Sequence, residues 1–216
     1  MSKIILLVTR PNYDYTTRYI SAWAKKIIDL AKSKGNIVLD LDKGRACKKE
    51  LESMVQKHSP SLVFLNGHGN DDLITGQDGA VIIQARQNES ILEGTITYAL
   101  SCRSAKILGK QSVVSGARAY IGYEEDFTFM YESEKRTKPH EDKITPLFLE
   151  PSNQVMVSLL KGNDVNRAYV NAKNAFFRNI QKSLTSESSS DDSSNIRYLL
   201  WDMQNLVYHG DGTATL

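Results

Sequence analysis

The sequence has little cysteine, little histidine and no long apolar run, and each shortage excludes a class of protein. The 216 residues include 2 cysteines and 4 histidines, which is too few for a disulfide framework and lacks the spacing of a structural zinc site. No stretch approaches the roughly 20 apolar residues that cross a bilayer, and the apolar run at residues 4–8 is too short for a signal peptide. We therefore expect no metal or other cofactor, no membrane contact and a reducing, cytoplasmic location.

The sequence also has no large excess of charge of one sign. The net charge is +2, and no block of Lys and Arg is longer than a pair, so we expect no direct binding to nucleic acid. Gly76 and Gly79 lack the Lys and Ser/Thr of a phosphate-binding loop. The residues after the first apolar run, 10–13, do not resemble a nucleotide-binding loop either, which counts against a flavodoxin-like binding domain.

What the sequence does contain is an alternation of short apolar runs and helical patterns. With 41% hydrophobic and 24% charged residues, the composition is that of an ordinary globular protein, and we expect one domain over residues 1–216. Runs of four to seven residues rich in Val, Ile, Leu and Tyr predict buried strands, and the segments between them predict helices. We expect a three-layer α/β fold with a mostly parallel sheet, built from strands at 4–9, 37–41, 61–65, 95–100 and 117–123 and from helices at 16–34, 45–58 and 104–115.

The remaining segments interrupt this alternation. Residues 73–83 predict a hairpin around Gly76 and Gly79, and the charged stretch 124–142 predicts either a functional loop or a partly disordered one. We expect flexible segments near 130–143 and 185–195, the second because 183–194 is rich in serine. Helical patterns occur at 144–160, with an interruption near Pro151, at 165–184 and at 196–208.

Two residues at predicted strand ends have side chains that are suited to catalysis. His68 lies between two glycines directly after the third strand, and Cys102 follows the fourth strand at the start of a predicted helix. The carboxyl ends of neighbouring parallel strands meet at one edge of the sheet, so both side chains are expected there. A helix N-terminus at Cys102 would favour the thiolate.

A thiol within hydrogen-bond distance of an imidazole is the smallest set of side chains that can catalyse nucleophilic acyl transfer. The imidazole takes the thiol proton and later protonates the leaving amine. The backbone N–H groups of Gly69 and Cys102 could then hold the oxyanion. An isolated cysteine is more often a small core residue, but the order and setting of this His and Cys favour a catalytic pair.

An apolar strand ending in His68-Gly69, followed by an apolar strand ending in Cys102, resembles the caspase-like cysteine peptidases. This group includes caspases, metacaspases, gingipains, clostripain, separases and CHAT-type domains. The resemblance extends over most of the chain, and its later parts, 147–149, 158–162 and 208–212, are closer to gingipain-like and CHAT-type proteins. It implies a caspase-like fold and a cysteine endopeptidase in which Cys102 is the nucleophile, His68 the general acid/base and Gly69 part of the oxyanion site.

One departure limits what the resemblance implies. Caspases have an Ala-Cys pair in a longer signature, whereas this chain has Ser101-Cys102-Arg103-Ser104, so the substrate rules of caspases do not transfer. In the family, loops after the first and fifth strands form the pocket for the residue before the scissile bond. The matching loops contain acids, which predict cleavage after Lys or Arg unless they form a solvated rim: Asp14, Glu124, Glu125 and Asp126.

The expected partners are a protein or peptide substrate and, if the domain is regulated, an activating or regulatory protein. The charged stretch contains Lys135, Arg136 and Lys138, so self-processing there is a further hypothesis. Asp71 and Asp72 could orient His68, although a simple turn explains them as well. The alternative to an active peptidase is a caspase-like regulatory or interaction module that is latent until a partner or signal acts on it.

Overall fold

The computed structural model of the chain describes residues 3–184 and 190–216. Its main sheet has six strands in the order β2-β1-β3-β6-β7-β8, and only β8 runs antiparallel to its neighbour. A separate antiparallel hairpin, β4 with β5, follows the third strand as predicted. The strands are β1 (Ile5–Arg10), β2 (Ile37–Asp42), β3 (Leu62–Asn66), β4 (Leu73–Thr75), β5 (Val81–Gln84), β6 (Ile96–Leu100), β7 (Ala119–Tyr123) and β8 (Leu206–Gly210).

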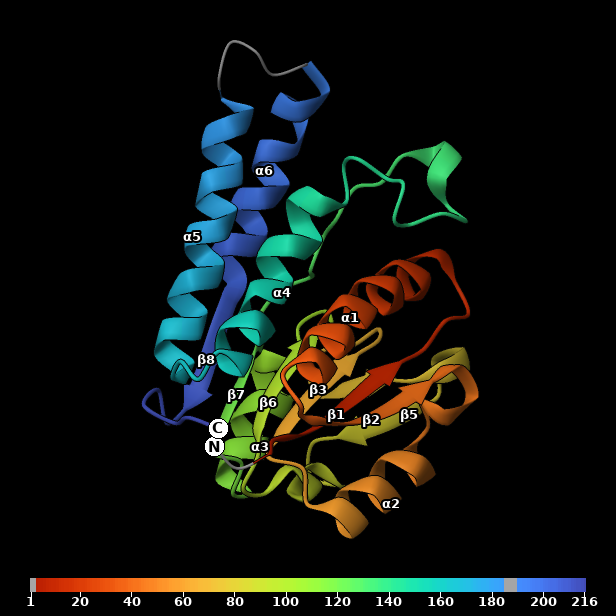
Figure 1. Cartoon of the computed structure of the whole chain (residues 1–216), viewed down its shortest axis with the longest axis vertical. Helices are drawn as coiled ribbons and strands as arrows, with labels where there is room; N and C mark the ends of the chain where they lie inside the picture. The colour runs from red at the N-terminus through yellow and green to blue at the C-terminus, as the bar shows by residue number, and fades with distance from the viewer. Residues whose placement is uncertain (1–2, 185–189) are drawn as a thin grey trace.

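Helices cover both faces of the main sheet, which confirms the predicted three-layer α/β architecture (Figure 1). The α-helices are α1 (Tyr15–Ser33), α2 (Lys48–His58), α3 (Lys110–Val114), α4 (Pro146–Leu160), α5 (Val165–Ser183) and α6 (Ser190–Asn205). Shorter helical turns are η1 (Lys43–Arg45), η2 (Gln77–Gly79), η3 (Glu89–Leu92), η4 (Ala105–Gly109) and η5 (Ser133–Lys135).

Side chains that alternate along each strand divide the core between the two faces. Leu6, Phe64 and Tyr98 pack with apolar residues of α1, α4 and α5. Leu7 and Val63 pack on the other face, with residues of α2, the hairpin and the segment before α3. Burial on both sides explains why these strands are continuous apolar runs rather than alternating ones.

Pro151 does not interrupt α4, so the predicted break there is wrong. Proline lacks the N–H that would bond to the carbonyl four residues earlier, that of Leu147. The side-chain amide of Asn179 on α5 donates to the Leu147 oxygen instead, at 2.8 Å. A neighbouring helix thus replaces the bond that proline removes, and the helix continues.

The end of the chain also differs from the prediction. The helix expected at 196–208 is α6, which begins earlier, at Ser190, and ends at Asn205. Residues 206–208 instead open β8, because Leu206, Val207 and Tyr208 favour strand and pair with the otherwise open edge of β7. The serine-rich linker expected at 183–194 is therefore helical from Ser190, and its residues 185–189 lie outside the described part of the chain.

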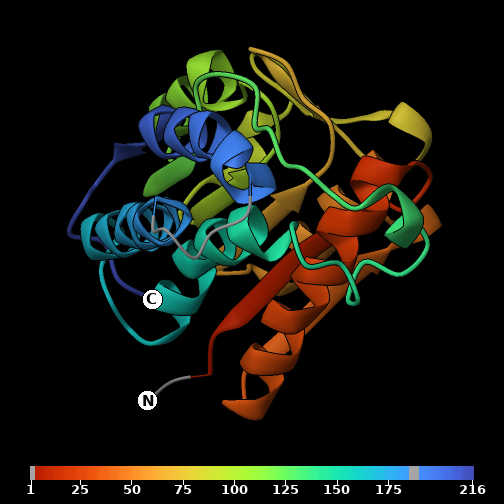
Figure 2. The same ribbon diagram turned by 90° about the horizontal axis from the view of Figure 1, so that it is seen from above.

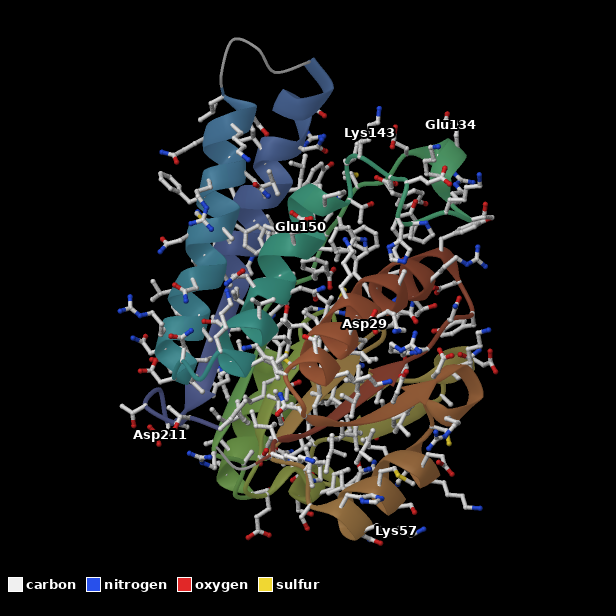
Figure 3. All side chains as sticks on the ribbon, in the orientation of Figure 1. Asp29, Lys57, Glu134, Lys143, Glu150 and Asp211 are labelled. Carbon is white, nitrogen blue, oxygen red and sulfur yellow. The ribbon has the colours of Figure 1, made fainter. Side chains whose placement is uncertain are left out.

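The segment between β7 and α4, residues 124–145, is here called the strap. It runs over α1 before turning into α4 (Figure 2), and Glu134 and Lys143 lie on its outer part (Figure 3). Phe127, Phe129 and Tyr131 pack against the main core, and the Tyr19 hydroxyl of α1 donates to Asp142 at 2.8 Å. The strap thus has defined contacts along its length, while its predicted flexibility stays a prediction.

The described residues include neither a membrane-spanning helix nor a cluster of metal-binding side chains. None of the helices between residues 3 and 184 or from 190 onward is long and apolar enough to cross a membrane. In the same residues, no group of three or more His, Cys, Asp or Glu side chains is placed to hold a metal ion.

Replacing Asn179 with Ala should destabilise the protein because the Leu147 carbonyl then loses the donor that replaces the missing proline N–H. We expect a loss of about 1 to 2 kcal/mol in the free energy of unfolding, measured by urea denaturation. Arg178→Ala, at the exposed neighbouring position on α5, is the matched control and should be near neutral. Equal effects of the two substitutions would contradict this explanation of the unbroken helix.

Candidate active site

The pairing of β3 with β6 brings His68 and Cys102 to the same edge of the sheet. The two strands are parallel and in register, and the last aligned pair is Asn66 with Leu100. His68 and Cys102 each lie two residues beyond that pair. Both predicted residues therefore occupy equivalent places on adjacent strands, at the carboxyl edge where ligands bind in such sheets.

Glycine is required on both sides of His68. A Cβ atom at Gly67 would lie 1.9 Å from the carbonyl oxygen of Thr75 in the hairpin, and one at Gly69 would lie 2.8 Å from the carbonyl oxygen of Cys102. The chain around His68 thus passes close to both the hairpin and the cysteine turn. Within the described residues, neither the Gly69 nor the Cys102 amide N–H forms a hydrogen bond.

His68 contacts an acid that the sequence analysis assigned to substrate binding. Its Nε2 atom lies 2.6 Å from Oδ2 of Asp14, which is the N-cap residue of α1 and accepts the backbone N–H of Thr17. Burial opposes ionisation of Asp14, but the hydrogen bonds from Thr17 and His68 outweigh it and lower the pKa of the carboxyl. The cap thus fixes the carboxylate, and the carboxylate fixes the imidazole.

Cys102 lies in a tight turn rather than directly at a helix N-terminus. Ser101 donates to Ser104 across the turn at 2.8 Å, Arg103 has a left-handed φ of 54°, and the wide turn η4 separates Cys102 from α3. Burial raises the pKa of the Cys102 thiol, contrary to the expected thiolate. The half-buried thiol donates to the carbonyl oxygen of Phe127 in the strap at 3.9 Å.

The other three acids of the predicted pocket are ion-paired with bases of the segment that follows Cys102. The bases follow in ascending order and their acids in descending order, with distances of 3.1, 3.0 and 3.4 Å. The pairs join Arg103 to Asp126, Lys106 to Glu125 and Lys110 to Glu124. All six side chains are more than a third exposed, so each pair adds little stability by itself. Together they attach the start of the strap beside the nucleophile.

Asp71 and Asp72 do not contact His68 in any described hydrogen bond. The side chain of Asn70 accepts the backbone N–H groups of Asp72 and Leu73, so the simple turn considered in the sequence analysis is present. Asp71 lies 3.6 Å from Arg103, and its carbonyl accepts two amides of η4. Asp71 thus fastens the histidine loop to the segment after the cysteine.

Helix α6 contributes two contacts to the site that were not predicted from the sequence. Trp201 donates from Nε1 to the carbonyl of Asp126 at 2.8 Å, and Asp202 accepts the backbone N–H of Thr128 at 2.9 Å. The two bonds flank Phe127, which covers the thiol. A signal did exist: Asp202 lies on the apolar face of the predicted helix, near Leu199 and Met203, where a charged residue is out of place.

Comparison with solved structures identifies the fold. The Arg-specific cysteine proteinase gingipain R matches with a TM-score of 0.62 and 12% identity over 98% of this chain and 47% of that chain. The complex of Porphyromonas gingivalis RgpB pro- and mature domains gives 0.60 and 10%, over 97% and 47%. The Saccharomyces cerevisiae separase–securin complex gives 0.53 and 14%, over 96% and 12%.

The fold is caspase-like. This confirms the predicted fold class, because gingipain R and separase are cysteine proteases with that fold. The chain spans about half the length of the gingipain structures, 47%. No protein-family model and no curated protein matches the sequence, so the resemblance to cysteine peptidases rests on structure and on the residues at the strand ends.

Replacing Asp14 with Asn tests the contact with His68, because Asn caps a helix as well as Asp does but carries no charge. Since the folded pKa of Asp14 is lowered, its carboxylate stabilises the fold above the unfolded pKa of about 3.9. Wild type should therefore unfold at a higher temperature than Asp14→Asn at pH 7. The difference should disappear as pH falls below 4 through the folded pKa of Asp14. A difference that persists unchanged at pH 2 would contradict the assignment.

Proposed function

We propose that this chain is a cysteine endopeptidase in which His68 and Cys102 form the catalytic pair. The observation that carries the proposal is their equivalent position after two adjacent, in-register strands, with Asp14 bound at Nε2 of the imidazole. An ionised Asp14 accepts the Nε2–H of His68, which leaves Nδ1 as the nitrogen that takes a proton. The likeness of the fold to gingipain R and separase supports the same reaction class.

In the proposed reaction, His68 removes the thiol proton of Cys102, and the thiolate attacks the carbonyl carbon of the scissile peptide bond. The negative charge that develops on the carbonyl oxygen is held by the amides of Gly69 and Cys102, neither of which has another partner among the described residues. His68 then gives its proton to the departing amine as the C–N bond breaks. Water, activated by the same imidazole, hydrolyses the thioester and regenerates the thiol.

We propose that cleavage follows a basic residue, Lys or Arg. Asp14 then acts as a positioning residue rather than as part of the substrate pocket, because its carboxylate is already committed to His68 and Thr17. Glu124, Glu125 and Asp126 have exposed partners, so a substrate cation could exchange with them at little cost.

The alternative function, a latent module, is favoured by one observation. The thiol of Cys102 is covered by Phe127, and its pKa is raised by burial, so the structure describes a resting state. Activation would then require the strap to move, under the action of a regulatory protein. RgpB was solved with its pro-domain and separase with securin, and a partner of this kind is proposed here by analogy.

We also propose a subgroup, a cellular location and two sites of regulation. Among the caspase-like peptidases, the sequence motifs after residue 147 favour the gingipain-like and CHAT-type subgroup. The location is the cytoplasm, where Cys47 and Cys102, both free, stay reduced. The strap and the segment at 185–194 are sites of self-processing or of control by a partner.

Hydrolysis of fluorogenic peptides ending in Arg, Lys or Asp tests the proposed function. Wild type should cleave after Arg or Lys, and Cys102→Ala and His68→Ala should each lower kcat/KM by at least about a thousandfold because the two act as a unit. Cys47→Ala is the matched control and should retain full activity. Cleavage after Asp alone would reject the basic preference. Silence on every peptide, with Cys102 no more readily alkylated than Cys47, would reject the active peptidase in favour of the latent module.

A further inference from the structure

The described residues contain three buried carboxylates, and one of them has an oxygen without a hydrogen-bond partner. The side chain of Glu89 accepts from the Gln87 amide and the Ser115 hydroxyl through different oxygens. Both oxygens of Asp142 likewise accept hydrogen bonds. Asp202 is fully buried, and its Oδ1 accepts the Thr128 amide, but its Oδ2 has no partner. A buried polar atom left without a partner is rare and costly, and it calls for an explanation.

Asp202 is connected to the nucleophile through two adjacent residues of the strap. It bonds to Thr128, the residue after Phe127, whose carbonyl lies 3.9 Å from the Cys102 sulfur. Its charge is near enough to contribute to the raised pKa of the Cys102 thiol. Trp201, the residue before Asp202, bonds to Asp126 on the other side of Phe127. The same short piece of strap therefore contacts both the thiol and the Asp202 carboxyl.

No cation accompanies Asp202. In the described part of the chain it forms no ion pair, and burial raises its pKa well above the ordinary value. The acids of the predicted pocket differ in this respect, because Glu124, Glu125 and Asp126 each have a Lys or Arg partner. Asp202 is thus the acid near Cys102 that is desolvated and still lacks a positive partner, the setting in which a charge-assisted bond is strongest.

We propose that Asp202 is the specificity-determining acid of this site, and that its Oδ2 receives the guanidinium or ammonium group of the substrate residue whose carbonyl Cys102 attacks. This inference rests on the proposed peptidase function. Withdrawal of Phe127 and Thr128 exposes the thiol and the carboxyl together. A basic side chain then supplies the partner that Oδ2 lacks, while a neutral side chain leaves the carboxyl buried without one.

Covalent labelling of Cys102 tests the inference without requiring turnover. The two probes are peptidyl chloromethyl ketones that end in arginine or in uncharged norleucine, and labelling rates are followed by intact mass and peptide mapping. Wild type should react with the arginine probe about a hundredfold faster than with the norleucine probe, and Asp202→Asn should reduce that preference to within about threefold. The rate with the norleucine probe should change little, because Asn keeps the acceptor for Thr128.

Matched variants distinguish a specific role of the Asp202 charge from a general loss of negative charge or of folding. Asp78→Asn removes an exposed acid of the hairpin turn η2, outside the site, and should leave the preference for arginine unchanged. Circular dichroism and thermal unfolding should show that Asp202→Asn is folded, and Asp202→Ser, which is smaller and also uncharged, should lose the preference as well. Cys102→Ala should not be labelled by either probe.

Each contrary result overturns the inference. A preference for arginine that survives in Asp202→Asn, or that is lost in Asp78→Asn, assigns the specificity to a different residue. Equal labelling by both probes in wild type excludes a basic pocket. If Cys102 and His68 are nevertheless required for peptide hydrolysis, the proposed function stands and only the role of Asp202 fails. If neither labelling nor hydrolysis depends on Cys102, both fail.

Discussion

The in-register parallel pairing of β3 with β6 is the constraint on which the rest of the site depends. It fixes where each strand ends, and the two chemically active residues follow at equal distances beyond the last aligned pair. A shift of register by one residue would turn one side chain to the opposite face of the sheet. The apolar residues of both strands are buried against helices on both faces, so the hydrophobic core itself holds the register.

Around this edge, polar contacts from distant parts of the chain fix individual side chains. The N-cap of α1 supplies the carboxylate for His68, and a run of three ion pairs attaches the strap beside Cys102. The C-terminal helix then holds the strap on both sides of Phe127. The result is a covered and protonated thiol, which fits either a peptidase that opens on substrate binding or a module that waits for a partner.

The sequence predicted the five parallel strands of the main sheet, the hairpin and the strand-end positions of His68 and Cys102, because burial patterns and glycine placement are local properties. It failed where a distant partner decides the structure. The Asn179 amide lets α4 pass Pro151, and the open edge of β7 turns residues 206–208 into a strand. Asp14 was assigned to substrate binding because it lies in the loop after the first strand, and nothing in the sequence indicates its hydrogen bond to His68, 54 positions away. Asp202 on the apolar face of α6 was a signal of a role for this helix, but its partners on the strap, 74 and 75 positions away, could not be identified from the sequence.

The central claim is that His68 and Cys102 lie side by side, and a disulfide between these positions tests it most directly. A bond of this kind forms only when the Cα atoms are about 4.4 to 6.8 Å apart. In a Cys47→Ser background, His68→Cys should form a disulfide with Cys102 on mild oxidation, seen by intact mass and peptide mapping, while His58→Cys on α2 should not. A folded His68→Cys protein in which both thiols remain open to alkylation after oxidation would contradict the account.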